Sequence, residues 1–106
     1  MQSHSVTVWL DQVKQGNDEA ARRLWDRYFP DLVKLARRRL AGTPRRMEDE
    51  EDVALSVLDS FCRAADKGRF PDLKDRHSLW RLLSRTTHRK VGDLVGRARR
   101  KVGEAD

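Results

Sequence analysis

The apolar residues of this chain recur with the period of an α-helix, and that spacing constrains the fold more than any other feature. Near the N-terminus four of them follow the spacing i, i+3, i+4 and i+7, which places them on one helix face: Val6, Trp9, Leu10 and Val13. Gly16 then predicts a helix end, and Asn17 predicts a new helix start as an N-cap. The first helix is therefore short.

A second apolar stripe runs with the same period through the next part of the chain: Ala21, Leu24, Trp25, Tyr28, Leu32, Leu35 and Leu40. Pro30 lies inside it and removes one backbone hydrogen bond, because proline has no N–H. Since the stripe keeps its register across Pro30, we expect a bent or restarted helix. Gly42, Thr43 and Pro44 are predicted to end it.

A third segment opens with five consecutive acidic residues, 48–52, which the pattern predicts to be exposed. Negative charge at a helix N-terminus is stabilised by the helix dipole. An apolar stripe follows: Val53, Ala54, Val57, Leu58 and Phe61. Gly68 is predicted to end the helix. The acidic run has two interpretations, which are helix capping and a docking surface for a basic partner.

A loop over residues 69–77 leads to a fourth segment, which Asp75 or Ser78 could cap. Its apolar stripe is less regular: Leu79, Leu82, Leu83, Thr87, Val91, Leu94 and Ala98. From about Arg97 the chain is mostly basic and has little apolar support, so these residues are expected to fray unless they are bound.

The four segments predict an all-α fold, a compact bundle of about four helices. With 106 residues and no internal repeat, the chain is expected to form one domain over residues 1–96, followed by a basic tail or linker start over 97–106. One core should contain the main stripe residues: Leu24, Trp25, Leu35, Val57, Leu58, Phe61 and Leu83. Trp9 is also predicted to lie in the core.

Positive charge is concentrated in the fourth segment. Residues 76–101 contain nine Lys or Arg and one acid, Asp93, for a charge of +8, so the rest of a chain of net charge +6 carries −2. Two interpretations are equally favoured, which are a nucleic-acid surface and a solvated basic face. A second basic block either covers a surface or neutralises the acidic run: Lys34, Arg37, Arg38, Arg39, Arg45 and Arg46.

Enzymatic chemistry is not visible in the sequence. Cys62 is the only cysteine, which fits a reducing compartment, and His4, His77 and His88 do not pair with it at a metal-ligand spacing. No phosphate-binding glycine loop or nucleophile with a base is recognisable. We therefore expect no catalytic residue, no metal and no cofactor. Without a membrane span or signal peptide, the protein is expected to be soluble and cytoplasmic.

The order of these features resembles region 2 of bacterial RNA polymerase sigma factors, and is most similar to the extracytoplasmic-function group. Glu51-Asp52-Val53, followed by Val57-Leu58, resembles the Glu-Asp-Leu opening of the family's second conserved segment. Leu79-Trp80-Arg81-Leu82-Leu83, continuing over residues 89–94, resembles its aromatic-led helix that ends in Asp and a basic tail. The resemblance spans roughly residues 5–101. Leu55 and Ser56 fall where the family often has Gln-Glu, and Arg89 falls where an Asn is common.

The resemblance implies two binding surfaces. The helix over residues 51–65 would dock on the clamp coiled coil of the largest subunit of the polymerase core, through these residues: Glu51, Asp52, Ser56 and Asp59. The preceding loop and the last helix would bind and help to open the minus-ten element of promoter DNA, through these residues: Lys74, Arg76, His77, Trp80, Arg81, Arg85, Arg89, Lys90, Arg97, Arg99 and Arg100.

Within the DNA-binding set, the helix arginines and Lys90 are expected to contact phosphates, and the loop residues to recognise bases. The ring of Trp80 is expected to lie in the core or to be partly buried, with stacking on an unpaired base as the alternative. The protein is expected to be a monomer with no membrane partner and with an anti-sigma factor as a further candidate partner. Two other functions stay open, which are a general nucleic-acid-binding helical module and a protein-interaction bundle without polymerase.

Overall fold

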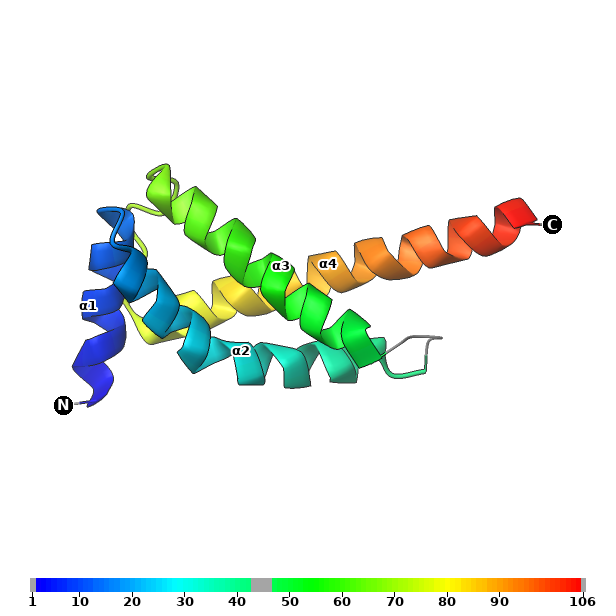
Figure 1. Cartoon of the computed structure of the whole chain (residues 1–106), viewed down its shortest axis with the longest axis horizontal. Helices are drawn as coiled ribbons and strands as arrows, with labels where there is room; N and C mark the ends of the chain where they lie inside the picture. The colour runs from blue at the N-terminus through cyan, green and yellow to red at the C-terminus, as the bar shows by residue number, and fades with distance from the viewer. Residues whose placement is uncertain (1, 43–46, 106) are drawn as a thin grey trace.

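Four helices make up the described chain. The computed structural model describes residues 2–42 and 47–105, and the side chains of residues 6–42 and 49–97. The helices are α1 (Gln2–Lys14), α2 (Asp18–Leu40), α3 (Met47–Asp66) and α4 (Arg76–Ala105), and the described residues include no strand. Figure 1 shows α3 crossing in front of α4, and the C-terminal part of α4 extending past the other helices. The predicted all-α bundle is confirmed.

The predicted boundary between α1 and α2 is confirmed. Gly16 adopts a φ of 83°, in the left-handed region that favours glycine. The amides of Gly16 and Asn17 each bond to carbonyls in the last turn of α1 at 3.0 Å. Asn17 caps α2, because its side-chain oxygen accepts a hydrogen bond from the Ala20 amide at 3.0 Å. The two helices are therefore joined by a turn with satisfied backbone groups.

Pro30 lies inside a single continuous helix. Figure 1 shows that α2 changes direction near its middle, so the bent helix is confirmed and a restarted helix is not formed. Pro30 lies on the exposed side of α2, where helix carbonyls can bond to water in place of the missing N–H. The bend lets both halves of α2 pack against the same core.

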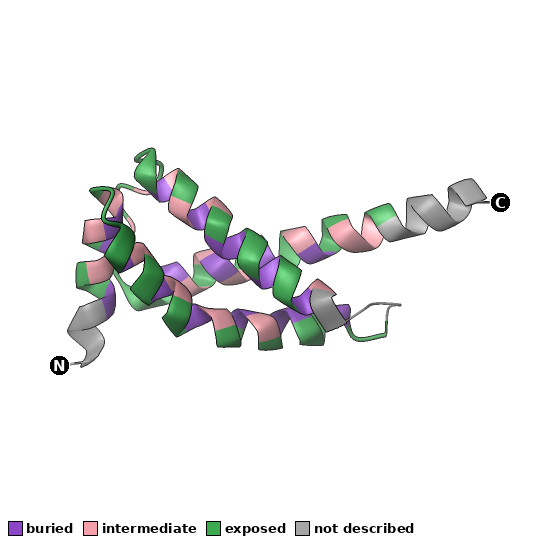
Figure 2. Cartoon of the chain, in the orientation of Figure 1, coloured by how far each residue is buried: buried purple, intermediate pink, exposed green. Residues whose placement is uncertain are grey.

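All four helices contribute to one hydrophobic core, seen as the inward-facing purple segments in Figure 2. Five of the predicted core residues belong to it: Leu24, Val57, Leu58, Phe61 and Leu83. Trp25 and Trp9 are only partly buried and pack against it, and Leu35 is buried outside that cluster. Thr87 is also fully buried, and its hydroxyl donates to the Leu83 carbonyl at 2.8 Å, so no polar group there lacks a partner.

The prediction that all the acids of residues 48–52 are exposed is wrong for Glu50, which is only 4% exposed. Glu50, Val53, Ala54 and Val57 follow the spacing i, i+3, i+4 and i+7, so Glu50 lies on the core side of α3. Its carboxylate pairs with the Arg37 guanidinium of α2 at 2.8 Å. The second basic block therefore neutralises the acidic run at this pair. Arg45 and Arg46 lie outside the described residues.

The backbone from Arg97, which the sequence predicts to fray unless bound, is part of α4, which continues to Ala105. Most residues of this last part are Arg, Ala and Lys, which are good helix formers. Glycine at positions 96 and 103 does not outweigh that preference. The side chain of Ala98, predicted to extend the apolar stripe, lies outside the described residues.

Leu58 tests the core because its side chain is 1% exposed, whereas Leu55 on the same helix is 42% exposed. Leu58→Ala is expected to lower the free energy of unfolding by about 2–5 kcal/mol, since it removes buried methyl groups and leaves a cavity. Leu55→Ala, the matched control, is expected to change it by less than about 1 kcal/mol. Denaturant unfolding followed by helical circular dichroism measures both. Equal losses in the two variants would contradict this packing.

Candidate functional site

The outward face of α3 is polar and accessible, as the sequence predicted. Glu51, Asp52, Ser56 and Asp59 are all exposed, while the neighbouring Val53 is buried. Asp59 forms an ion pair with Arg63, one helix turn further on, at 3.3 Å. Both side chains of this pair stay more than half exposed, so water screens the pair and a competing charge could replace it at little cost.

Leu55 lies within this acidic face and is a candidate binding residue that the sequence analysis did not assign. It is three residues after Asp52 and four before Asp59, so the three side chains share one side of the helix. Its side chain is 42% exposed, and Val8 is the other large apolar side chain exposed among the described residues. The signal was available in the sequence, since Leu55 falls opposite the buried stripe.

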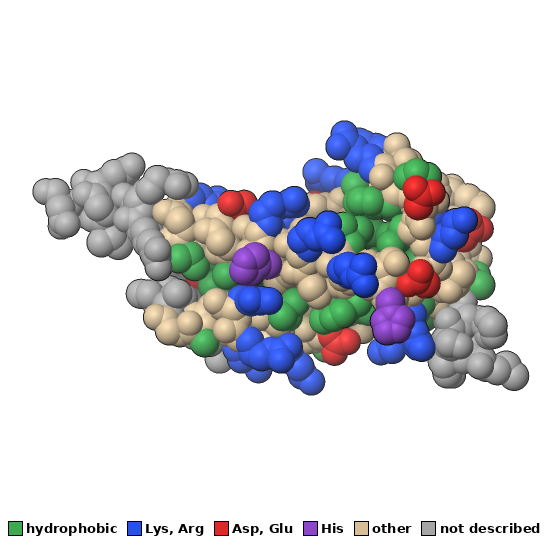
Figure 3. Space-filling model, turned by 180° about the vertical axis from the view of Figure 1, so that it is seen from behind, with side chains coloured by type: hydrophobic (Ala, Val, Ile, Leu, Met, Phe, Trp, Pro, Cys, Tyr) green, Lys and Arg blue, Asp and Glu red, His purple; other side chains and the backbone are tan. Residues whose placement is uncertain are grey.

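The basic residues of α4 form a surface on the opposite side of that helix from its buried residues. Five predicted DNA-binding residues are exposed there or at the helix start: Arg76, His77, Arg81, Arg85 and Arg89. Figure 3 shows Lys and Arg side chains gathered along α4 and over the adjoining α2, with few acidic side chains among them. The side chains of Arg99 and Arg100 lie outside the described residues.

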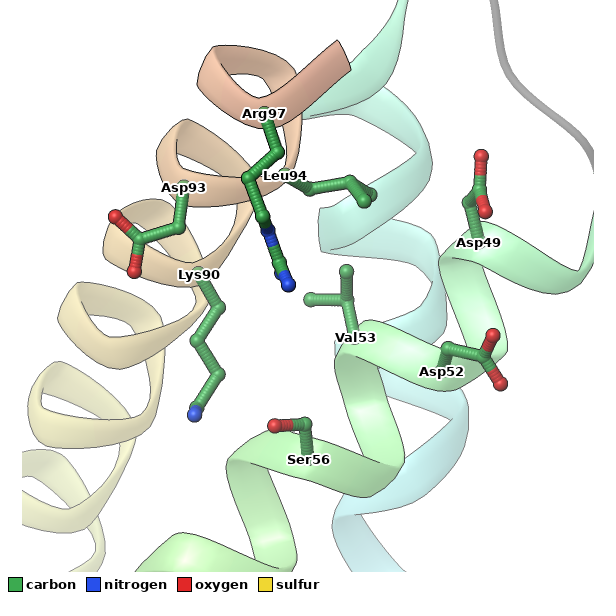
Figure 4. A pocket seen from close by; sticks show the side chains of 8 residues that line it. All are labelled: Asp49, Asp52, Val53, Ser56, Lys90, Asp93, Leu94 and Arg97. Atoms are coloured by element: carbon green, nitrogen blue, oxygen red, sulfur yellow. The ribbon is translucent and has the colours of Figure 1, made fainter. Parts of the chain in front are cut away.

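Lys90 and Arg97 lie on a different side of α4 from Arg81, Arg85 and Arg89. They line a groove of about 300 Å³ between α3 and α4. Figure 4 shows both side chains reaching towards Val53 and Ser56 of α3, while Asp52 and Asp93 turn outward. Five of the eight residues lining the groove are charged, so it lacks the mainly apolar lining of a small-molecule pocket. The structure thus separates the predicted cations into two groups.

Trp80 is half-buried, which confirms the partial burial expected for it. Its ring stacks on Tyr28 of α2, with ring centroids 6.2 Å apart and an interplanar angle of 23°. Burial raises the pKa of Tyr28, against the opposing effect of the Arg27 and Arg76 charges, so the phenol is neutral at pH 7. Tyr28 therefore fixes the orientation of Trp80, a role that its place in an apolar stripe did not reveal.

The loop between α3 and α4 is ordered at both ends. At its start, Phe70 stacks on Phe61, with ring centroids 5.7 Å apart. At its end, Asp75 caps α4, because its carboxylate accepts hydrogen bonds from the Ser78 amide at 2.8 Å and the Ser78 hydroxyl at 3.2 Å. Of the two caps considered from the sequence, the structure uses Asp75. Lys74 lies between these two fixed points and is exposed.

The described residues include one free thiol and no cluster of three His, Cys, Asp or Glu side chains that could hold a metal ion. Burial, followed by the charge of Asp59, raises the pKa of the Cys62 thiol to about 11, so this thiol is a poor nucleophile at neutral pH. None of the described helices has the length and apolar character needed to cross a membrane.

A comparison with protein-family models matches residues 3–104 to the family described as ECF sigma factor. The match includes all of α2 and α3 and all but one end residue of α1 and of α4. No curated protein and no solved structure matches the chain.

Asp75 is expected to stabilise the start of α4 more when it is ionised than when it is protonated. The hydrogen bond from the Ser78 amide, with smaller effects from the Ser78 hydroxyl and His77, lowers the pKa of Asp75 below its ordinary value of 3.8. A lowered folded-state pKa means that the stabilisation is complete above pH 3.8 and is lost as pH falls through the lowered value.

Asp75→Ala should therefore lower the thermal midpoint at neutral pH, and the difference from the parent should shrink on acidification. Asp72→Ala is the control, because Asp72 is an exposed acid of the same loop that caps no described helix. A difference that stays constant down to acid pH would contradict a role for the charged carboxylate.

Proposed function

The chain belongs to the ECF sigma factor family, and from this premise we propose that α3 binds polymerase core and α4 binds promoter DNA during transcription initiation. Membership means that the protein binds RNA polymerase and recognises promoter DNA, as a transcription regulator. We further propose that it acts in the cytoplasm as a monomer.

The outward face of α3 is proposed to dock on the clamp coiled coil of the polymerase core. It combines an exposed leucine with the acids Asp52 and Asp59 on either side. An apolar anchor surrounded by charge is the usual composition of a binding surface, because the anchor supplies affinity and the charges supply orientation. The Asp59–Arg63 ion pair can open at little cost when a basic partner approaches.

The basic face of α4 is proposed to hold the opened non-template strand of the minus-ten element. Arg81, Arg85 and Arg89 are exposed at intervals of four residues and can follow a phosphate backbone along the helix. Lys90 and Arg97 would add phosphate contacts from the groove beside α3, and the tail residues Arg99 and Arg100 would extend them.

Base recognition is proposed to come from the loop and from Trp80. Lys74, Arg76 and His77 are exposed next to the start of α4. Stacking on Tyr28 holds the Trp80 ring rigid while part of it stays accessible, which suits a platform for an unpaired base. Such stacking would favour the melted strand over the duplex and so help to open the promoter.

The observation that carries this proposal is the separation of charge between two helices of one core. The acidic face belongs to α3 and the basic face belongs to α4, while the apolar sides of both helices are buried together. A general nucleic-acid-binding module would need the basic face alone. An exposed acidic face with a central leucine is what a second, protein partner requires.

Reversing the charge on α3 should weaken binding to polymerase core. Asp52→Lys with Asp59→Lys is expected to reduce the affinity by about tenfold or more, since both charges face the partner. The control is Asp11→Lys with Asp26→Lys, which reverses two exposed acids on α1 and α2. Affinities come from titration of labelled protein with core enzyme, and circular dichroism checks folding. Equal affinities for the two folded double variants would refute the α3 assignment.

Variants of α4 should fail in two different ways when assayed in the assembled holoenzyme. Arg89→Ala should weaken binding to any DNA sequence and reduce the salt dependence by about one counterion. Trp80→Ala should weaken binding to single strands by about 1–3 kcal/mol while sparing duplex binding. Promoter opening and binding at several salt concentrations measure these effects. If both variants open promoters as well as the parent does, the basic face of α4 is a solvated surface with no role in DNA binding.

A further inference from the structure

Lys14, the last residue of α1, contacts the loop that joins α3 to α4. Its ammonium group donates a hydrogen bond to the carbonyl of Pro71 at 3.2 Å and another to the carbonyl of Leu73 at 2.5 Å. The lysine is partly buried, and the two carbonyls lie 57 and 59 residues further along the chain. Neither the polymerase surface nor the DNA surface accounts for this contact.

The contact falls on the middle of the loop, where the Leu73 side chain also packs against the hydrophobic core. The loop starts with Phe70 stacked on Phe61 and ends at Asp75, the N-cap of α4. Between these points the backbone makes one turn bond, from the Leu73 amide to the Phe70 carbonyl at 3.2 Å. Lys14 therefore supplies two of the bonds that fix the middle of the loop.

We propose that Lys14 is a positioning residue for promoter reading, which fixes the backbone of residues 71–74 and thereby holds Lys74 at the start of α4. This inference rests on the proposed function, because it takes the loop to be a base-reading element. Hydrogen bonds from a charged donor are stronger than neutral ones, so a single side chain can select one loop conformation.

This role differs from direct phosphate binding by Lys14. A phosphate ligand would contribute equally to all sequences and to the salt dependence of binding. A positioning residue would instead change which bases are preferred and how well the loop is ordered, while the salt dependence stays at the parental value. The two roles therefore predict different results for the same variant.

The first test measures loop order in the full chain by amide hydrogen exchange. Lys14→Met keeps much of the side-chain length but removes the charge and the donors. It should speed exchange of the Leu73 amide by roughly tenfold, since the turn loses its support. The Ala20 amide, which Asn17 caps, should exchange as in the parent. Lys14→Arg should keep the protection, because a guanidinium can also donate to two carbonyls.

Lys67→Met is the matched control, since it removes an exposed lysine from the start of the same loop. It should leave Leu73 exchange unchanged. Unchanged exchange in Lys14→Met would overturn the inference, as would equal acceleration in Lys67→Met. Acceleration at Ala20 as well would mean a general loss of stability, which also contradicts a local role.

The second test measures base preference in the holoenzyme with a pool of templates whose promoter region is randomised. Lys14→Met should weaken the base preference at the same promoter positions as Lys74→Ala, by roughly tenfold in relative enrichment. Its affinity for polymerase core and the salt dependence of its DNA binding should equal those of the parent. If Lys74→Ala flattens the profile and Lys14→Met does not, the positioning role fails and the proposed function stands. If neither changes it, Lys74 does not read bases and the positioning role fails, while the parts of the proposed function that rest on Arg76, His77 and Trp80 are unaffected. A uniform loss with a smaller salt dependence would make Lys14 a phosphate ligand.

Discussion

The burial of every fourth residue of α4 is the constraint on which the rest of the structure depends. Leu79, Leu83, Thr87 and Val91 are each at most 5% exposed. This row advances slowly around the helix, so one side of α4 stays buried for more than three turns, and α4 packs against both α2 and α3. Arg81, Arg85 and Arg89 are offset from the row by two residues, which is a little more than half a turn. They must therefore face solvent whenever the row is buried.

The same reasoning explains the face of α3. Val53, Val57 and Phe61 point into the core, so Asp52 and Asp59 can only lie outside it. Because α3 and α4 each bury one side in the shared core, folding exposes the acidic face of α3 and the basic face of α4 together. Repulsion among the cations of α4 costs the fold little, because the exposed arginines point into water and not towards one another across the core. A partner anion would then relieve that repulsion.

Much of this arrangement could be predicted from the sequence, because it depends on the period of apolar residues and on local capping. The boundary at Gly16 and Asn17, the bend at Pro30 and the exposed Asp52 and Asp59 all follow from neighbours within one or two helix turns. Leu55 could have been assigned by the same reasoning, since it falls opposite the buried stripe.

Contacts between distant segments could not be predicted in this way. The burial of Glu50 depends on Arg37 from another helix, and a carboxylate without such a partner would be too costly to bury. Lys14 donates to the carbonyls of Pro71 and Leu73 because α1 packs beside the loop, and no local sequence pattern predicts that packing. The direction of Lys90, into the groove and not along the basic face, likewise depends on how α3 crosses α4.

The central claim is that this small helical domain joins RNA polymerase core to promoter DNA, and binding to core tests it most directly. Purified chain mixed with polymerase core should co-elute with it on size exclusion at physiological salt, in equal molar amounts. An established sigma factor added in excess should displace it, because both would occupy the same surface. A chain that elutes alone, from a core preparation that binds the established sigma factor, would contradict the account.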